Sequence, residues 1–151
     1  MKHPLTITDL MTERGPNGVA RQCDDYLRAE GIMFVCLDRH EQLAAKHLGF
    51  SLQDKGVCDR IVFVPHGRPW RHVGDVQLFL STITDAKSGI RYGTCAGAVA
   101  IEYKRPNRGR ISAAQKAFAR ECAEIGLPHA YITGLDELKL LIPPKSEWMK
   151  R

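Results

Sequence analysis

With 151 residues, of which 44% are apolar and 26% charged, the chain has the size and composition of one globular domain, which excludes a disordered or fibrous protein. Its net charge of +5 is compatible with a polyanionic partner, because basic side chains gain affinity when phosphate counterions are released. No apolar run approaches the roughly 20 residues that span a bilayer, and the first residues lack the apolar stretch of a signal peptide, so we expect no membrane partner.

The first third of the chain predicts a helix, a strand and a second helix. Residues 1–15 show no periodicity, and we treat them as an N-terminal arm. From Val19 onward apolar residues recur at helical spacing, up to a helix stop at Gly31. The short apolar run 32–37 is typical of a buried strand, and a capping-box pattern after it predicts a helix over 39–48.

The middle of the chain predicts two core strands that are separated by an insertion. Residues 59–64 read as a strand closed by a proline, and residues 98–104 form the clearest strand of the chain. Between them, residues 66–97 form an inserted segment. A turn cluster between 76–84 and 90–92 favours a hairpin within it.

The last third predicts a helix, a strand and a short helix. A capping box of Ser112 and Gln115 begins the first of these helices. Its expected apolar stripe consists of Ala114, Phe118, Cys122 and Ile125. A strand at 129–133 and a helix at 135–142 follow, and residues 143–151 form a C-terminal tail.

The predicted order is helix, strand, strand, strand, helix, strand. Such an order favours an α/β architecture, in which a mixed sheet is flanked by helices. We expect this domain to occupy residues 16–142, with the segment 66–97 inserted between its second and third strands.

A carboxylate and an ammonium group lie close together at the end of the strand 98–104. Because side chains alternate across a strand, Glu102 and Lys104 project from the same face, which continues through the small residues Ala98 and Ala100. We expect these small residues to leave room for a ligand to approach the sheet. Taken alone, the charged pair is better explained as an exposed ion pair on an edge strand.

Asp59, at the head of the preceding strand, supplies a second carboxylate. Neighbouring strands can place two such residues around one ion, and Mg²⁺ needs few carboxylates because it keeps waters and takes phosphate oxygens from its substrate. A metal ion held by Asp59 and Glu102 would polarise a phosphoryl group, while Lys104 would orient the attacking water or neutralise the transition state. This set of residues is suited to hydrolysis of a phosphodiester.

Three motifs surround these residues. They are Gly56-x-x-Asp59, Ile101-Glu102-x-Lys104-Arg105-Pro106 and Gly109-Arg110-Ile111-Ser112-x-x-Gln115. In this order they resemble the signature of the virus-type replication-repair nuclease (VRR-NUC) domains of the PD-(D/E)XK nuclease superfamily. The resemblance covers about residues 55–142, with weaker similarity in the first helix, and implies a restriction-endonuclease-like core with the order αβββαβ.

The resemblance implies a role for each matching residue. Asp59 and Glu102 would bind Mg²⁺ or Mn²⁺ together with the backbone carbonyl of Tyr103, and Lys104 would serve the attacking water. Gln115 would lie beside the site, although its capping box explains it equally well. The implied activity is cleavage of DNA, on branched, flapped or junction substrates, by a homodimer. We expect it in the cytoplasm or nucleoid of a bacterial or phage-infected cell.

A basic cluster follows the expected site. It consists of Arg105, Arg108, Arg110 and Lys116. Beside a metal centre such charges suit contact with a phosphate backbone, which positions DNA without reading its sequence. The alternative is a solvated loop with no partner.

Two departures from the family pattern leave a second function open. Cys58 stands where the family has a proline before its first aspartate, so the entry to that strand is less constrained. The glutamate that the family carries early in its first helix has no aligned counterpart, and Glu13 and Glu30 are its candidate substitutes. The chain can therefore also be a nuclease-like DNA-binding module without catalysis.

The five cysteines are scattered and odd in number, which indicates a reducing compartment. A zinc site is conceivable from four His and Cys residues, whose spacing matches no familiar ligand pattern. They are Cys58, His66, His72 and Cys95. We therefore expect them to be structural.

Overall fold

The structure is a computed structural model, which describes five stretches of the chain. They are residues 18–37, 58–71, 82–84, 87–107 and 109–148. The expected arm at 1–15 and the expected helix at 39–48 lie outside the described residues. Within the described stretches, no helix is long and apolar enough to cross a membrane.

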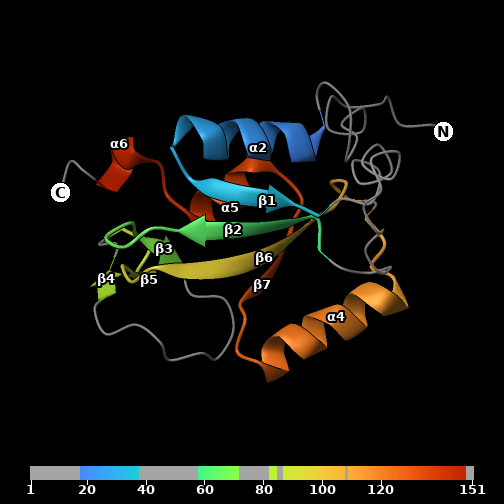
Figure 1. The fold of residues 1–151 in the computed structure, drawn as a ribbon. Coiled ribbons are helices and arrows are strands. Elements are labelled where there is room, and N and C mark those ends of the chain that lie inside the picture. The colour runs from blue at the N-terminus through green and yellow to red at the C-terminus, as the bar shows by residue number, and fades with distance from the viewer. Residues whose placement is uncertain (1–17, 38–57, 72–81, 85–86, 108, 149–151) are drawn as a thin grey trace, which may run out of the picture.

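Four strands form the central sheet, in the order β1-β2-β6-β7 (Figure 1). β1 (Met33–Cys36) pairs antiparallel with β2 (Arg60–Val64), which pairs antiparallel with β6 (Gly97–Tyr103). β7 (His129–Ile132) runs parallel to β6, and a parallel neighbour requires a crossover. Helix α4 (Ala113–Glu124) provides that crossover. The chain therefore has the mixed sheet flanked by helices that the element order predicted.

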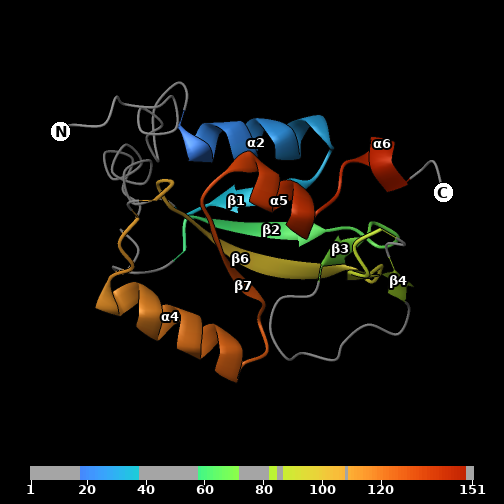
Figure 2. The same cartoon turned by 180° about the vertical axis from the view of Figure 1, so that it is seen from behind.

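Helices cover the sheet on both faces. α2 (Val19–Ala29) and α5 (Leu135–Leu141) lie on one face and α4 on the other (Figures 1 and 2). The face under α2 and α5 holds the larger core, and its fully buried aliphatic residues are Val19, Leu27, Val62, Val99, Ile101, Leu138 and Ile142. The α4 face has a small core around Cys58, Ala100 and Cys122. Most of the hydrophobic stabilisation therefore comes from the α2 face.

The expected buried strand at 32–37 is wrong in one respect. β1 is an edge strand of the sheet, and the side chains of Met33 and Val35 are 66% and 43% exposed. α4 packs over Ala100 of β6 and beside β7, so within the described residues it leaves this face of β1 open. A short apolar run cannot distinguish an edge position from a central one.

Helix α4 begins as predicted, and half of its expected apolar stripe packs on the sheet. The Ser112 hydroxyl accepts a hydrogen bond from the main chain of Gln115, whose side chain accepts one from the main chain of Ser112. Cys122 is buried and Phe118 packs against the same small core, as expected, whereas Ala114 is exposed and Ile125, which follows the helix, is 77% exposed. Gln115 also contacts the sheet, where its amide binds the charged pair at the end of β6.

The inserted segment forms a second sheet. β3 (Trp70–Arg71), β4 (Thr82–Thr84) and β5 (Arg91–Gly93) make three antiparallel strands in the order β3-β5-β4. The predicted hairpin is confirmed as the pair of β4 and β5. The segment leaves the main sheet after β2 and returns before β6, so it lies at the end opposite to the start of β2 (Figure 1).

The end of the chain packs beside α2. α6 (Lys145–Trp148) is a single helical turn within the expected C-terminal tail. The hydroxyl of Tyr26 on α2 donates a 2.6 Å hydrogen bond to the carbonyl of Ile142, just after α5. This bond fastens α2 to the C-terminal segment at the end of the molecule that carries the second sheet.

Candidate active site

Asp59 and Glu102 lie opposite each other at one end of the central sheet. The ladder between β2 and β6 ends at the pair of Arg60 and Ile101, and Asp59 and Glu102 are the next residues of the two chain segments. The main-chain N–H of Tyr103 donates a 2.8 Å hydrogen bond to Oδ2 of Asp59, which fastens that carboxylate to β6. The structure thus brings the two carboxylates together.

Both carboxylates belong to the α4 face of the sheet. Ile61 and Ala100 pack in the core under α4, and alternation along each strand puts Asp59 and Glu102 on the same face as these two residues. Asp59 is 7% exposed and Glu102 is 3% exposed. The two acids are therefore buried as well as adjacent.

The thiol of Cys58 is close to both carboxylates. Its pKa is raised to about 12, first by burial and then by the neighbouring Cys122, Glu102 and Asp59 in that order of importance. The same thiol donates a hydrogen bond to the carbonyl of Arg60. Cys58 is therefore a protonated, fully buried side chain, which packs beside the two carboxylates.

Lys104, Glu102 and Gln115 form a closed triangle of hydrogen bonds. Nζ of Lys104 lies 3.0 Å from Oε1 of Glu102 and 2.8 Å from Oε1 of Gln115. The amide nitrogen of Gln115 donates to the same Glu102 oxygen. Lys104 is only 6% exposed, so the interpretation of Glu102 and Lys104 as an exposed ion pair is wrong.

The side chain of Gln115 both forms the capping box of α4 and contacts the charged pair of Glu102 and Lys104. Its side-chain oxygen accepts from the main chain of Ser112 and from the ammonium group of Lys104. The capping box of α4 therefore holds the amide in the position from which it contacts Glu102 and Lys104.

The loop between β6 and α4 packs tightly on Lys104. A Cβ added to Gly109 would lie 2.7 Å from Cβ of Lys104 and 3.1 Å from the carbonyl of Arg105. Real side chains do not approach that closely, so this contact requires glycine. Gly109 thereby lets the loop bring Ser112 and Gln115 beside the charged pair.

The small residues of β6 do not leave the open space that the sequence suggested. Ala100 is completely buried, and it packs against Cys58 and Cys122. Its small side chain admits α4 and not a ligand, because the helix crosses the sheet at this point.

The sequence interpretation missed a network of three polar side chains under the site. Arg60 binds the carboxylate of Asp24, and the hydroxyl of Tyr103 donates to the same carboxylate. All three are buried on the α2 face. Strand alternation could have indicated Arg60, because it shares the inward positions of Val62 and Val64.

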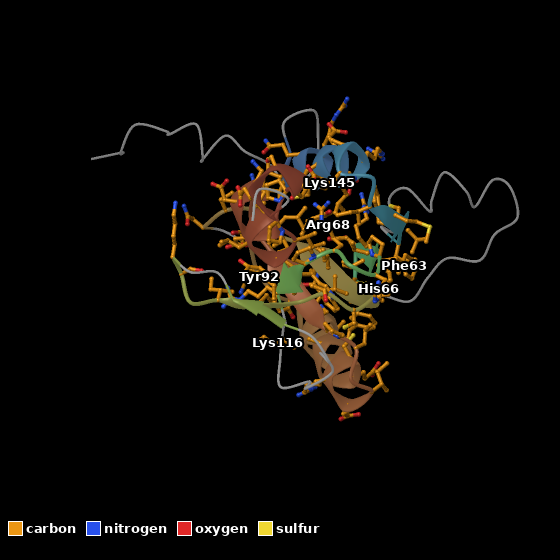
Figure 3. All side chains as sticks on the ribbon, turned by 90° about the vertical axis from the view of Figure 1, so that its left-hand side faces the viewer. Phe63, His66, Arg68, Tyr92, Lys116 and Lys145 are labelled. Carbon is orange, nitrogen blue, oxygen red and sulfur yellow. The ribbon has the colours of Figure 1, made fainter. Side chains whose placement is uncertain are left out.

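Glu30 does not replace the missing glutamate of the family. Its carboxylate accepts from the guanidinium of Arg68 at 2.6 Å and from the main chain of Lys145 at 2.9 Å. Figure 3 views the molecule from the side that carries α6 and shows Arg68 and Lys145 there, whereas Asp59 precedes β2 and is separated from Arg68 by the length of that strand. Glu13, the other candidate substitute, lies outside the described residues.

The conceivable zinc ligands are divided between the two ends of the sheet. Cys58 precedes β2, whereas His66 follows it and Cys95 precedes β6. The length of β2 therefore separates Cys58 from the other two, and His72 lies outside the described residues. In the part of the chain that the structure describes, no three His, Cys, Asp or Glu side chains form a metal-binding group. Two carboxylates can still hold Mg²⁺, because water, carbonyl and substrate oxygens complete its shell.

Exposed cations border the triangle. Arg105 and Arg110 flank the loop that packs on Lys104, and Lys116 follows Gln115 on α4; all three are exposed. Arg108, the fourth member of the predicted basic cluster, lies outside the described residues. The sheet end therefore combines buried acids with exposed positive charge.

No protein-family model, no curated protein and no solved structure matches this chain.

Proposed function

We propose that this protein is a metal-dependent nuclease that hydrolyses phosphodiester bonds in DNA. The proposal rests on one observation. Two buried carboxylates, Asp59 and Glu102, lie where the ladder between β2 and β6 ends, Asp59 is bonded to the main chain beside Glu102, and Lys104 is paired with Glu102.

The burial of both acids favours a bound cation. Asp59 is 7% exposed and Glu102 is 3% exposed. Carboxylates that share a buried site repel each other unless a proton or a cation intervenes. Hard oxygen donors suit Mg²⁺ or Mn²⁺, and the backbone carbonyl of Tyr103 is the third protein ligand that we propose.

The chain's own residues supply the remaining chemistry. When bound, the metal would polarise the phosphoryl group and lower the pKa of a water. Lys104 holds a positive charge next to Glu102, where it can orient an attacking water or neutralise a transition state. Gln115 keeps the ammonium group in place through its side-chain oxygen.

The topology supports a nuclease core of the PD-(D/E)XK type. The core contains α2, three antiparallel strands β1, β2 and β6, the crossover helix α4 and the parallel strand β7. This order agrees with the αβββαβ core that the VRR-NUC resemblance implies. Glu102 lies on the third strand and Asp59 directly before the second, which agrees with the positions that the resemblance implies.

DNA is the substrate that we propose, because exposed cations border the acids and the whole chain is basic. Arg105, Arg110 and Lys116 would contact the phosphate backbone without reading bases, and we include Arg108 on the basis of the sequence. By the same resemblance we propose branched, flapped or junction DNA as substrate, a homodimer, and action in the cytoplasm or nucleoid.

The test is a cleavage assay with labelled flap, junction, duplex and single-stranded DNA in Mg²⁺ or Mn²⁺. Glu102→Gln and Lys104→Ala should each lower the cleavage rate by about 100-fold or more, because each removes a group that acts at the reacting centre. Glu121→Gln, on the exposed side of α4, is the matched control and should cleave like the wild type.

Two results would overturn the proposal. Cleavage at the wild-type rate by both site variants would mean that the activity belongs to another site or to a contaminant. Binding of all four DNAs without cleavage of any would favour the catalytically inactive DNA-binding module.

A further inference from the structure

A buried network of polar side chains lies on the α2 face, directly beneath the proposed site. Nε of Arg60 donates to both oxygens of Asp24, at 3.0 and 3.2 Å, and Nη2 donates to Oδ2 at 2.7 Å. The hydroxyl of Tyr103 donates to Oδ1 of Asp24 at 3.1 Å. The guanidinium of Arg60 also lies 5.5 Å from the centre of the Tyr103 ring. The network joins α2, β2 and β6.

Packing alone does not account for this network. The other inward residues of β2 are Val62 and Val64, and those of β6 are Val99 and Ile101, which fill the same core without polar groups. Arg60 is 2% exposed and Asp24 is 7% exposed, and removing such an ion pair from water costs more than burying aliphatic groups. The charged pair replaces aliphatic residues at the end of the sheet that carries the site.

The network reaches the main chain of the proposed metal-binding residues. Nη1 of Arg60 donates to the carbonyl of Asp59 at 2.9 Å, and the same carbonyl accepts from the main chain of Leu37 at 2.7 Å. Tyr103 holds the carboxylate of Asp59 through its own N–H. Arg60 and Tyr103, whose side chains lie on one face of the sheet, are thus both hydrogen-bonded to Asp59, and Tyr103 is the chain neighbour of Glu102.

We propose that Asp24, Arg60 and Tyr103 are positioning residues, which hold Asp59 and Glu102 at the separation that a divalent cation requires. The inference rests on the proposed function. Asp24 acts through Arg60 and Tyr103, so its loss should loosen the metal site without removing a ligand.

The test measures Mn²⁺ binding by calorimetry in the absence of DNA, together with kcat and KM for cleavage. Asp24→Asn should weaken Mn²⁺ binding by about 10-fold or more, as loss of supporting residues around metal ligands commonly does. Tyr103→Phe, which removes one hydroxyl, should weaken it by about 3-fold, which is typical of one lost hydrogen bond. In both variants kcat should fall while KM for DNA stays near the wild-type value.

Tyr26→Phe is the matched control, because it removes a hydroxyl bond between α2 and the rest of the chain at the opposite end of the molecule. It should lower the melting temperature and leave Mn²⁺ affinity unchanged. If Tyr103→Phe and Asp24→Asn also lower only the melting temperature, the network is merely structural and the inference is overturned.

The wild-type measurement separates this inference from the proposed function. If the wild-type protein binds no Mn²⁺, both are overturned. If it binds Mn²⁺ in a manner that Glu102→Gln abolishes, and Asp24→Asn binds equally well, only the positioning role is overturned.

Discussion

The main-chain N–H of Tyr103 donates a 2.8 Å hydrogen bond to the carboxylate of Asp59, so the acid at the start of β2 is fastened to the strand that carries Glu102. Oδ2 of Asp59 therefore accepts a hydrogen bond from the main chain of the sheet. The pairing of β2 with β6 ends at Arg60 and Ile101, and this side-chain hydrogen bond links the two segments just beyond that pair. The hydrogen bond therefore keeps the two buried acids, Asp59 and Glu102, at the same end of the sheet.

Replacing Asp59 tests that arrangement with little change in shape. Asp59→Asn keeps an oxygen that can accept from Tyr103, but it removes the charge that would attract a cation. We expect the melting temperature to stay close to the wild-type value in metal-free buffer, while Mn²⁺ binding is lost and cleavage falls by about 100-fold or more.

Asp25→Asn is the control for this change, because Asp25 is exposed on α2 and pairs only weakly with Arg21 and Arg28 on the surface. Wild-type Mn²⁺ affinity in Asp59→Asn, measured by calorimetry, would remove Asp59 from the metal site.

Gly109 provides a test that changes no charged group. Gly109→Ala would put its methyl group 2.7 Å from Cβ of Lys104, so the loop must move and the contact of Gln115 with Lys104 must loosen. We expect a loss of about 1–3 kcal/mol in the free energy of unfolding, as overpacking commonly causes. Cleavage should fall as well, which steady-state kinetics and urea denaturation would measure together.

Gly134→Ala is the matched substitution, because nothing lies within 4 Å of a Cβ at that position and its backbone is extended. This variant should cleave like the wild type. Equal activity of the two alanine variants would show that the packing of Gly109 on Lys104 has no bearing on the site.

The sequence predicted much of this site because strand alternation is a local property. Alternation predicted that Glu102 and Lys104 share one face of their strand. The apolar run after Asp59 indicated where the neighbouring strand begins. The pairing of Asp24 with Arg60 joins residues 36 positions apart, and no local pattern predicts which buried acid meets which buried arginine. The same holds for the edge position of β1, which depends on the order of strands in the sheet.

The two ends of α4 show where an apolar pattern does not decide burial. Apolar spacing favoured a stripe of four residues, of which Phe118 and Cys122 pack on the sheet while Ala114 and Ile125 are exposed. Burial of one alanine methyl contributes little, whereas the amide of Gln115 forms hydrogen bonds with Glu102 and Lys104. A polar residue therefore contacts the sheet at the first turn of the helix.

A pH titration of stability would test the packing between α4 and β7. His129 lies between the rings of Phe118 and Tyr131, with ring centres 6.0 and 4.8 Å away, and burial lowers its pKa from the ordinary value of 6.5. The folded protein therefore binds this proton less readily than the unfolded chain. The stability that the neutral, buried imidazole of His129 contributes is fully present above pH 6.5. This stability is lost as the pH falls through the lowered pKa of His129 in the folded protein.

The measurement is urea denaturation at several pH values between 7.5 and 5. The free energy of unfolding should decrease over this range in the wild type, and the decrease should be smaller in His129→Phe, which cannot bind the proton. His66→Gln, a change at an exposed position, should keep the wild-type dependence. A dependence that is identical in all three proteins would exclude His129 as its source.

The salt dependence of DNA binding tests the basic border of the site. Arg105→Ala, Arg110→Ala and Lys116→Ala each remove one exposed cation beside Lys104. If each contacts one phosphate, the slope of log K against log salt should become shallower by about 0.9 per variant, and affinity should fall equally for different DNA sequences. Lys145→Ala, which removes an exposed cation on α6, at the other end of the molecule from the loop between β6 and α4 (Figure 1), should leave the slope unchanged. Fluorescence anisotropy from 50 to 200 mM salt would measure both quantities, in a Ca²⁺ buffer that prevents turnover. An equal change in slope for Lys145→Ala would mean that binding follows total charge, so that DNA makes no preferred contact with the end of the sheet where Asp59 and Glu102 meet.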